Sequence, residues 1–140
     1  MPNPPTTWMY GPIAKNTETD NINAGHGTCM VSKVAGKDFG VAKKANLIIS
    51  KATTQGSDTE WAFEKVLDDT MDTKCQKRVV VPFARGATFS YLPGDEKKSP
   101  WPVVNAIMKD MFENDIVVVT SLGNLGEGPG HSDVDTLSKI

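Results

Sequence analysis

Two residues of the sequence lie in surroundings that suit catalytic chemistry. His26 lies between Gly25 and Gly27, directly before a run of small and apolar residues with helical character. An imidazole at the start of a helix can act as a general base, and flanking glycines let backbone and substrate approach closely. Asn124 follows Gly123 after an apolar run, and its side-chain amide can donate a hydrogen bond to a developing oxyanion. His26 and Asn124 are therefore the candidate catalytic residues.

Each candidate also has an ordinary structural interpretation. A lone histidine beside glycines is commonly a loop or cap residue, and asparagine after glycine is a common turn residue. Cys29 is expected to be a small buried hydrophobe rather than a reactive thiol. His131, in a Gly-Pro-Gly-His-Ser loop, is expected to have no specific role. The surrounding sequence has to decide between the two interpretations.

The elements that would position these residues alternate between helix and strand. Helical spacing predicts three helices, over 26–35, over 57–73 and from Pro100 onward. Short β-branched runs predict three strands between and after them, over 46–52, 78–83 and 116–120. Pro82 is expected to limit the second of these strands. Helices that alternate with β-branched strands predict an α/β fold, with a three-layer, mostly parallel sheet covered by helices on both faces.

Local signals mark the expected helix ends. Gly36 occupies the position of a helix stop, and Ser57 and Glu60 have the spacing of a capping box. Ser99 and Pro100 pair an N-cap with proline at the first helical position. The last helix has one apolar stripe, formed by Val104, Ile107, Met108, Met111 and Phe112.

Composition restricts the class of protein. The 140 residues, 39% of them hydrophobic, predict a single domain over 1–140, in which 1–24 form an extended segment with a short strand near 8–10. The net charge of -2 predicts neither a nucleic-acid partner nor a membrane partner. No apolar run approaches the ~20 residues that cross a bilayer. The first residues lack a signal-peptide pattern, so the location of the protein stays open.

Cofactor chemistry is not expected from this sequence. The two cysteines, Cys29 and Cys75, form no dense framework and leave the redox compartment open. Neither His26 nor His131 belongs to a metal-binding motif. We therefore expect no metal and no cofactor.

Two separated stretches resemble one protein family. Residues 25–32, Gly-His-Gly-Thr-Cys-Met-Val-Ser, resemble the histidine motif of the subtilisin-like serine proteases, and 40–47 are similar to the Gly-Val-Ala-x-x-Ala-x-Leu stretch that follows it. A cysteine directly after His-Gly-Thr resembles the thiol-bearing branch that includes proteinase K-type and fungal enzymes. Residues 116–124, ending Leu-Gly-Asn, resemble the strand that delivers the oxyanion asparagine of the family. The resemblance implies His26 as general base, Asn124 as oxyanion donor, a peptide or protein substrate and an extracellular location.

The sequence departs from the family pattern at three places. Subtilases place the nucleophile in a Gly-Thr-Ser-x-Ala-like stretch, and the 140 residues contain none. The aspartate of the family ends a strand about 30–40 residues before the histidine, by analogy with its triad order, whereas Asp20 lies much closer to His26. The family's Ser-x-Gly strand end, which binds substrate, reads Phe-Ala-Arg-Gly at 83–86. Since triad catalysis is lost without its nucleophile, we expect the chain to be inactive alone.

The absent aspartate strand raises a question of topology. In the family this strand lies between the strands that match 46–52 and 79–83, so these two must pair directly, admit a substitute or leave unpaired backbone groups. An exposed sheet without its covering helix favours a homodimer. Alternatively, residues 1–15 fold back and supply a strand at 8–10.

Three interpretations of the function stay open. The chain is a fragment or truncated product of a subtilisin-like endopeptidase, or it is a degenerate homologue that serves as a non-catalytic secreted binding or effector protein. An unrelated α/β binding domain with a chance His-Gly-Thr ranks last. An aspartate strand upstream and a Gly-Thr-Ser helix downstream in an extended reading frame would favour the protease.

Overall fold

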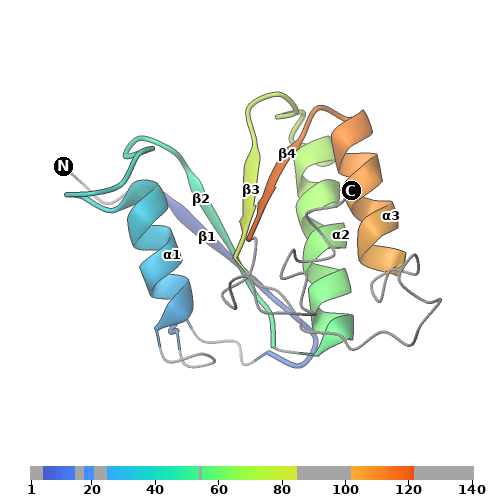
Figure 1. The fold of residues 1–140 in the computed structure, drawn as a ribbon, viewed down its shortest axis with the longest axis horizontal. Coiled ribbons are helices and arrows are strands. Elements are labelled where there is room, and N and C mark those ends of the chain that lie inside the picture. Colours follow the sequence, from blue (N-terminus) through green and yellow to red (C-terminus); the bar gives the residue numbers. More distant parts are fainter. Residues whose placement is uncertain (1–4, 15–17, 21–24, 54, 85–101, 122–140) are drawn as a thin grey trace, which may run out of the picture. The chain divides into compact units, whose positions relative to one another are not determined.

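The order of the elements follows the alternation predicted from the sequence. The computed structural model describes residues 5–14, 18–20, 25–53, 55–84 and 102–121. The elements are β1 (Thr6–Tyr10), α1 (His26–Ala35), β2 (Leu47–Lys51), α2 (Gly56–Asp72), β3 (Val80–Phe83), α3 (Pro102–Glu113) and β4 (Val117–Thr120) (Figure 1). Helices and parallel strands make this an α/β protein, as the sequence predicted.

The chain divides into two compact units, Met1–Val66 and Leu67–Ile140, with the boundary inside α2. The first contains β1, α1 and β2, and the second contains β3, α3 and β4. Each unit is therefore a β-α-β arrangement with parallel strands, because a parallel pair needs a crossover connection such as a helix. The prediction of one domain over 1–140 stays a prediction.

In the first unit, β1 pairs with β2 in parallel, from Thr6 opposite Leu47 to Tyr10 opposite Lys51. This confirms the short strand predicted near residues 8–10. Trp8 and Tyr10 lie on one side of β1, as alternate strand residues do, and their rings stack with centroids 6.2 Å apart and planes 9° apart. The aromatic pair thus covers one side of this strand.

In the second unit, β3 and β4 pair in parallel, from Val80 opposite Val117 to Phe83 opposite Thr120. Helix α3 connects them and contacts β4. Its buried residues recur at helical spacing and are Val104, Ile107, Met108 and Met111. With Ile116, directly before β4, they form the apolar core of this unit.

The described strands form two separate sheets of two strands each. Strand β2 takes β1 as its partner. Direct pairing of β2 with β3, one of the three alternatives, would join strands of the two units and stays a prediction.

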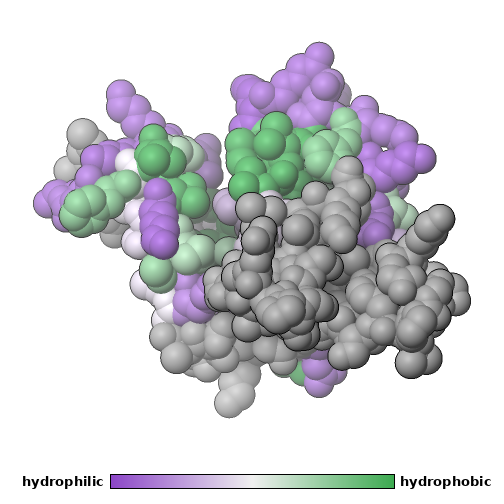
Figure 2. All heavy atoms as spheres, in the orientation of Figure 1, coloured by the Kyte–Doolittle hydropathy of each residue, from purple (hydrophilic) through white to green (hydrophobic). Residues whose placement is uncertain are grey.

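The strands of the second unit expose apolar side chains on one face within the described part of the chain. Val80, Val117 and Val119 are 60%, 52% and 52% exposed. They belong to one face, because Val80 lies opposite Val117 and side chains alternate along each strand. Figure 2 shows a hydrophobic patch over these strands. The β-branched runs alone do not reveal which face of a strand a neighbouring element covers.

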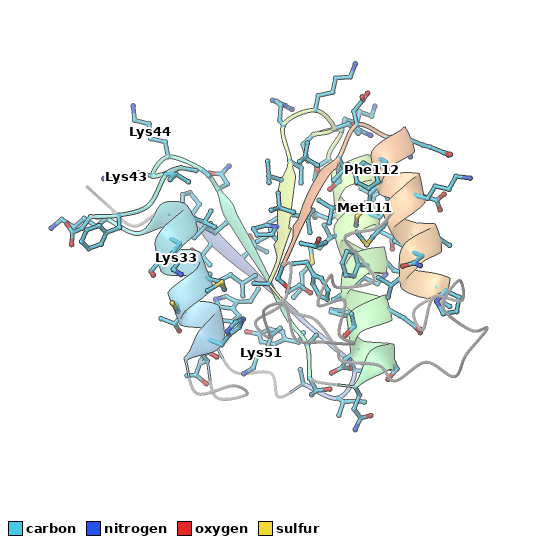
Figure 3. The ribbon with its side chains drawn as sticks, viewed as in Figure 1. Lys33, Lys43, Lys44, Lys51, Met111 and Phe112 are labelled. Carbon is cyan, nitrogen blue, oxygen red and sulfur yellow. The ribbon has the colours of Figure 1, made fainter. Side chains whose placement is uncertain are left out.

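Several predicted helix details also need correction. Helix α2 begins at Gly56, so Ser57 lies inside its first turn and is not the N-cap of a capping box. Phe112 does not join the buried stripe of α3: it is 51% exposed, whereas Met111 is fully buried (Figure 3). Phe112 directly follows Met111, and successive helical residues point about 100° apart. The predicted start at Ser99 and Pro100 lies outside the described residues.

Pro82 does not limit its strand. It lies inside β3, opposite Val119. Proline lacks an N–H donor, which an edge strand tolerates because one of its sides needs no ladder partner. β3 is such a strand among the described residues, since it pairs only with β4.

Candidate functional site

His26 is the first residue of α1, as the sequence predicted. The preceding Gly25 has φ 86° and ψ 10°, a left-handed conformation that suits glycine because other residues meet steric strain there. The backbone carbonyl of Gly25 accepts the first helical hydrogen bond, from Cys29 N at 3.0 Å. His26 itself is exposed. The Gly-His-Gly-Thr stretch therefore presents an imidazole at the open end of a helix.

A carboxylate from the preceding loop completes the start of this helix. Asp20 Oδ2 accepts a hydrogen bond from Thr28 N at 2.7 Å. The Thr28 N–H lowers the pKa of Asp20, and the nearby positive charges of His26 and Lys51 lower it further. Asp20 therefore carries its negative charge at neutral pH beside His26.

Lys51 links this site to the sheet. It is the last residue of β2 and only 7% exposed (Figure 3). The charges of Lys51 and His26 both lower the pKa of Asp20. That His26 packs beside the carboxyl end of this strand stays a prediction. In open α/β sheets, binding sites commonly lie at the carboxyl ends of the strands.

A second carboxylate organises the same end of the sheet and was missed in the sequence. Asp58, fully buried in the first turn of α2, accepts hydrogen bonds from Ile13 N (3.1 Å, Oδ1) and Thr53 N (2.8 Å, Oδ2). These partners follow β1 and β2 respectively. Gly11 is needed here, because a Cβ on it would come within 2.9 Å of the carboxylate. An acidic residue in the first helical turn was the available signal, but it was interpreted as part of a local cap.

The two cysteines have different environments. Cys29 is exposed, so the expectation of a buried small hydrophobe is wrong. It lies on α1, of whose residues only Ala35 is buried. Cys75 is half-buried, and its backbone N–H donates to Thr70 O at 3.2 Å.

The other predicted residues lie outside the described part of the chain. This holds for Asn124, the candidate oxyanion donor, and for His131; the description of the strand that precedes Asn124 ends at Ser121. The position of Asn124 relative to His26 is therefore not described. Among the described residues, no three histidine, cysteine, aspartate or glutamate side chains gather as metal ligands would. No described helix is long and apolar enough to span a bilayer.

The arrangement that the structure does describe suits proton transfer. An exposed imidazole at a helix start can accept a proton from a neighbouring group. The described residues thus present a side chain of the type that a general base requires, in a helical turn that Asp20 caps.

Comparison with known proteins identifies relatives over nearly the whole chain. The family model of the subtilase family matches residues 5–139. A subtilisin-like protease 2 of Trichophyton rubrum is 29% identical over 126 residues, which cover 84% of this chain and 26% of the relative. A subtilisin-like protease of Coccidioides posadasii is 34% identical over 119 residues, or 82% of this chain and 26% of the relative.

The chain thus spans about a quarter of the length of these curated relatives. No solved structure matches it. The match to the family model covers far more than half of the chain and includes both the histidine motif and the predicted asparagine strand. This protein belongs to the subtilase family of serine proteases.

Proposed function

We propose that this chain is the part of a subtilisin-like serine endopeptidase that carries the general base, His26, and the oxyanion donor, Asn124. The position of His26 as the exposed first residue of α1 is the observation that supports this most. The substrate is a peptide or protein, as the family implies. An extracellular location, suggested by the family resemblance, belongs to the same proposal.

In this role His26 takes the proton of a serine hydroxyl during attack and returns it to the leaving amine. Asn124 donates to the oxygen of the tetrahedral intermediate, where negative charge develops. The 140 residues contain no Gly-Thr-Ser-x-Ala-like stretch to supply that hydroxyl. The chain alone therefore does not hydrolyse peptides, and the base acts only where a nucleophile is provided.

The test is an assay of the purified chain with casein and short chromogenic peptides, paired with a serine-directed fluorophosphonate. We expect no turnover above buffer and no stoichiometric labelling. Turnover that His26→Ala abolishes, together with labelling of one defined serine, would contradict the proposal. His131→Ala, which changes the only other histidine, is the matched control.

A second candidate is a non-catalytic binding protein on the same scaffold, with a second copy of the chain as its partner. The uncovered face of β3 and β4, with Val80, Val117 and Val119 more than half exposed, favours this candidate. Light scattering over a tenfold dilution tests it: a dimer that Val117→Lys dissociates would support self-association. A monomeric mass at every concentration would exclude it.

A further inference from the structure

Helix α1 begins without a cap of its own. The N–H groups of a first helical turn have no partners within the helix, and Ser, Thr, Asp or Asn at the N-cap usually accepts one of them. The N-cap here is Gly25, which has no side chain and makes no side-chain cap hydrogen bond. The glycine provides the left-handed turn before His26, and the acceptor has to come from elsewhere.

Asp20 supplies this acceptor from eight residues upstream. Its Oδ2 lies 2.7 Å from Thr28 N, and Thr28 is the third residue of the helix. A side chain at the N-cap bonds to the second or third helical N–H, so Asp20 takes the place of the absent cap. Because Thr28 and His26 share one helical turn, the hydrogen bond fixes the turn that carries the imidazole.

The acceptor is a charged group. The Thr28 N–H lowers the pKa of Asp20 below its usual value, and the charges of His26 and Lys51 lower it further. A hydrogen bond to an ionised carboxylate is stronger than one between neutral groups, which strengthens the cap.

We propose that Asp20 is a positioning residue for His26: it caps α1 through Thr28 N and so holds the helical turn from which the imidazole projects. This rests on the proposed function, since the base that Asp20 positions is His26. Asp20 does not replace the family's aspartate in the sequence pattern, because it belongs to the loop directly before the histidine motif.

The experiment measures the cap and the position of the imidazole separately on the full chain. Amide hydrogen exchange of Thr28 reads the cap. The chemical shifts of the His26 ring protons read the position of the imidazole, with those of His131 as internal reference. The variants are Asp20→Asn and Asp20→Ala.

We expect Asp20→Asn to keep the cap, because its amide oxygen can accept from Thr28 N, and to leave the His26 ring signals close to those of the wild type. Asp20→Ala loses the cap, so Thr28 exchanges about threefold to tenfold faster. The His26 ring signals then shift or broaden, while those of His131 stay unchanged.

Unchanged Thr28 exchange in Asp20→Ala would overturn the proposal, as would unchanged His26 ring signals in that variant. A cap that does not position the imidazole would change only the exchange rate, so the ring signals exclude a merely structural role. Neither readout needs turnover. A failure of the proposed function would appear in the hydrolysis assay, whereas a failure of this proposal would appear in the exchange rates and the ring signals.

Discussion

In the unit that contains β3, α3 and β4, the helix buries Val104, Ile107, Met108 and Met111 against the strands, and Ile116 lies beside them. In the unit that contains β1, α1 and β2, helix α1 buries only Ala35. The same order of elements is thus stabilised in two ways. Apolar packing dominates the second unit, whereas the described residues of the first bury fewer apolar side chains, Ala35 and Phe63, together with polar ones.

The polar contacts of the first unit gather where the candidate site lies. Its buried polar or charged residues are Lys51, Asp58 and Thr59. Phe39 and Val41, after α1, are 90% and 91% exposed. The difference teaches that the unit with His26 relies more on hydrogen bonds and charges than the other unit does.

The largest expected loss of stability comes from the core of the second unit. Met111→Ala removes a fully buried side chain and is expected to lower the free energy of unfolding by about 2–5 kcal/mol, because it leaves a cavity. Urea denaturation of the full chain measures the change. Met71→Ala, at a side chain that is 40% exposed, is the matched control and should cost less than about 1 kcal/mol. Similar losses in both variants would show that burial in the core of the second unit does not determine its stability.

The second largest loss of stability is expected from substitution of Asp58, the buried carboxylate of the first unit. Asp58→Ala leaves the part-buried N–H groups of Ile13 and Thr53 without these acceptors, and we expect a loss of about 1–3 kcal/mol. Asp58→Asn retains one acceptor oxygen and should cost less. Glu64→Ala, at an exposed acidic position of the same helix, serves as control. A loss below about 0.5 kcal/mol for Asp58→Ala would show that buried polar contacts do not stabilise this unit.

A substitution at Gly40, where the backbone after α1 approaches the helix closely, should cause a similar or somewhat smaller loss of stability. A Cβ on Gly40 would collide with backbone atoms of Gly36 and Ala35, so Gly40→Ala is expected to destabilise by about 1–3 kcal/mol. Gly27→Ala is the control, because its Cβ would lie 3.5 Å from Asp20 Oδ2, an ordinary contact. Thermal denaturation compares the two variants. Equal melting temperatures would indicate that the turn at Gly40 opens easily.

The smallest effect concerns pH. The folded structure lowers the pKa of Asp20, chiefly through Thr28 N–H, so its ionised form stabilises the fold above the unfolded pKa of about 3.9. This contribution is lost as the pH falls through the lower, folded pKa. The stability difference between wild type and Asp20→Asn should therefore be constant near neutral pH and shrink in acid. A difference that grows as the pH falls would contradict the assigned sign.

The regular elements were largely predictable, because their signals are local. The spacing of Val104, Ile107 and Met111 predicted the buried face of α3, and the β-branched run over 116–120 predicted β4. The strand at Trp8 was predicted too, but its partner was not. Pairing of β1 with β2 joins residues about 40 positions apart in sequence, and no local pattern specifies that register.

The candidate site was predictable only in part. The glycines around His26 revealed the start of α1. Asp20 was considered only as a candidate for the family's aspartate and set aside because it lies too close to His26, so its hydrogen bond to Thr28 was not predicted. Asp58 was missed because its acceptor role for Ile13 spans 45 residues. The sequence analysis wrongly predicted that Cys29 is buried. Which side of a small-residue helix is covered depends on the elements around it, and the sequence of the helix does not show this.

Native-state hydrogen exchange of the full chain tests most directly whether the two units are held together differently. The account predicts that amides of α3 and β4 exchange only on global unfolding, whereas those of α1 and β2 exchange through local opening that costs at least about 1 kcal/mol less. In Asp20→Ala, the amides of α1 should exchange faster still, whereas the exchange rates of the α3 amides should stay unchanged. Amides of α1 as well protected as those of α3 would contradict the account.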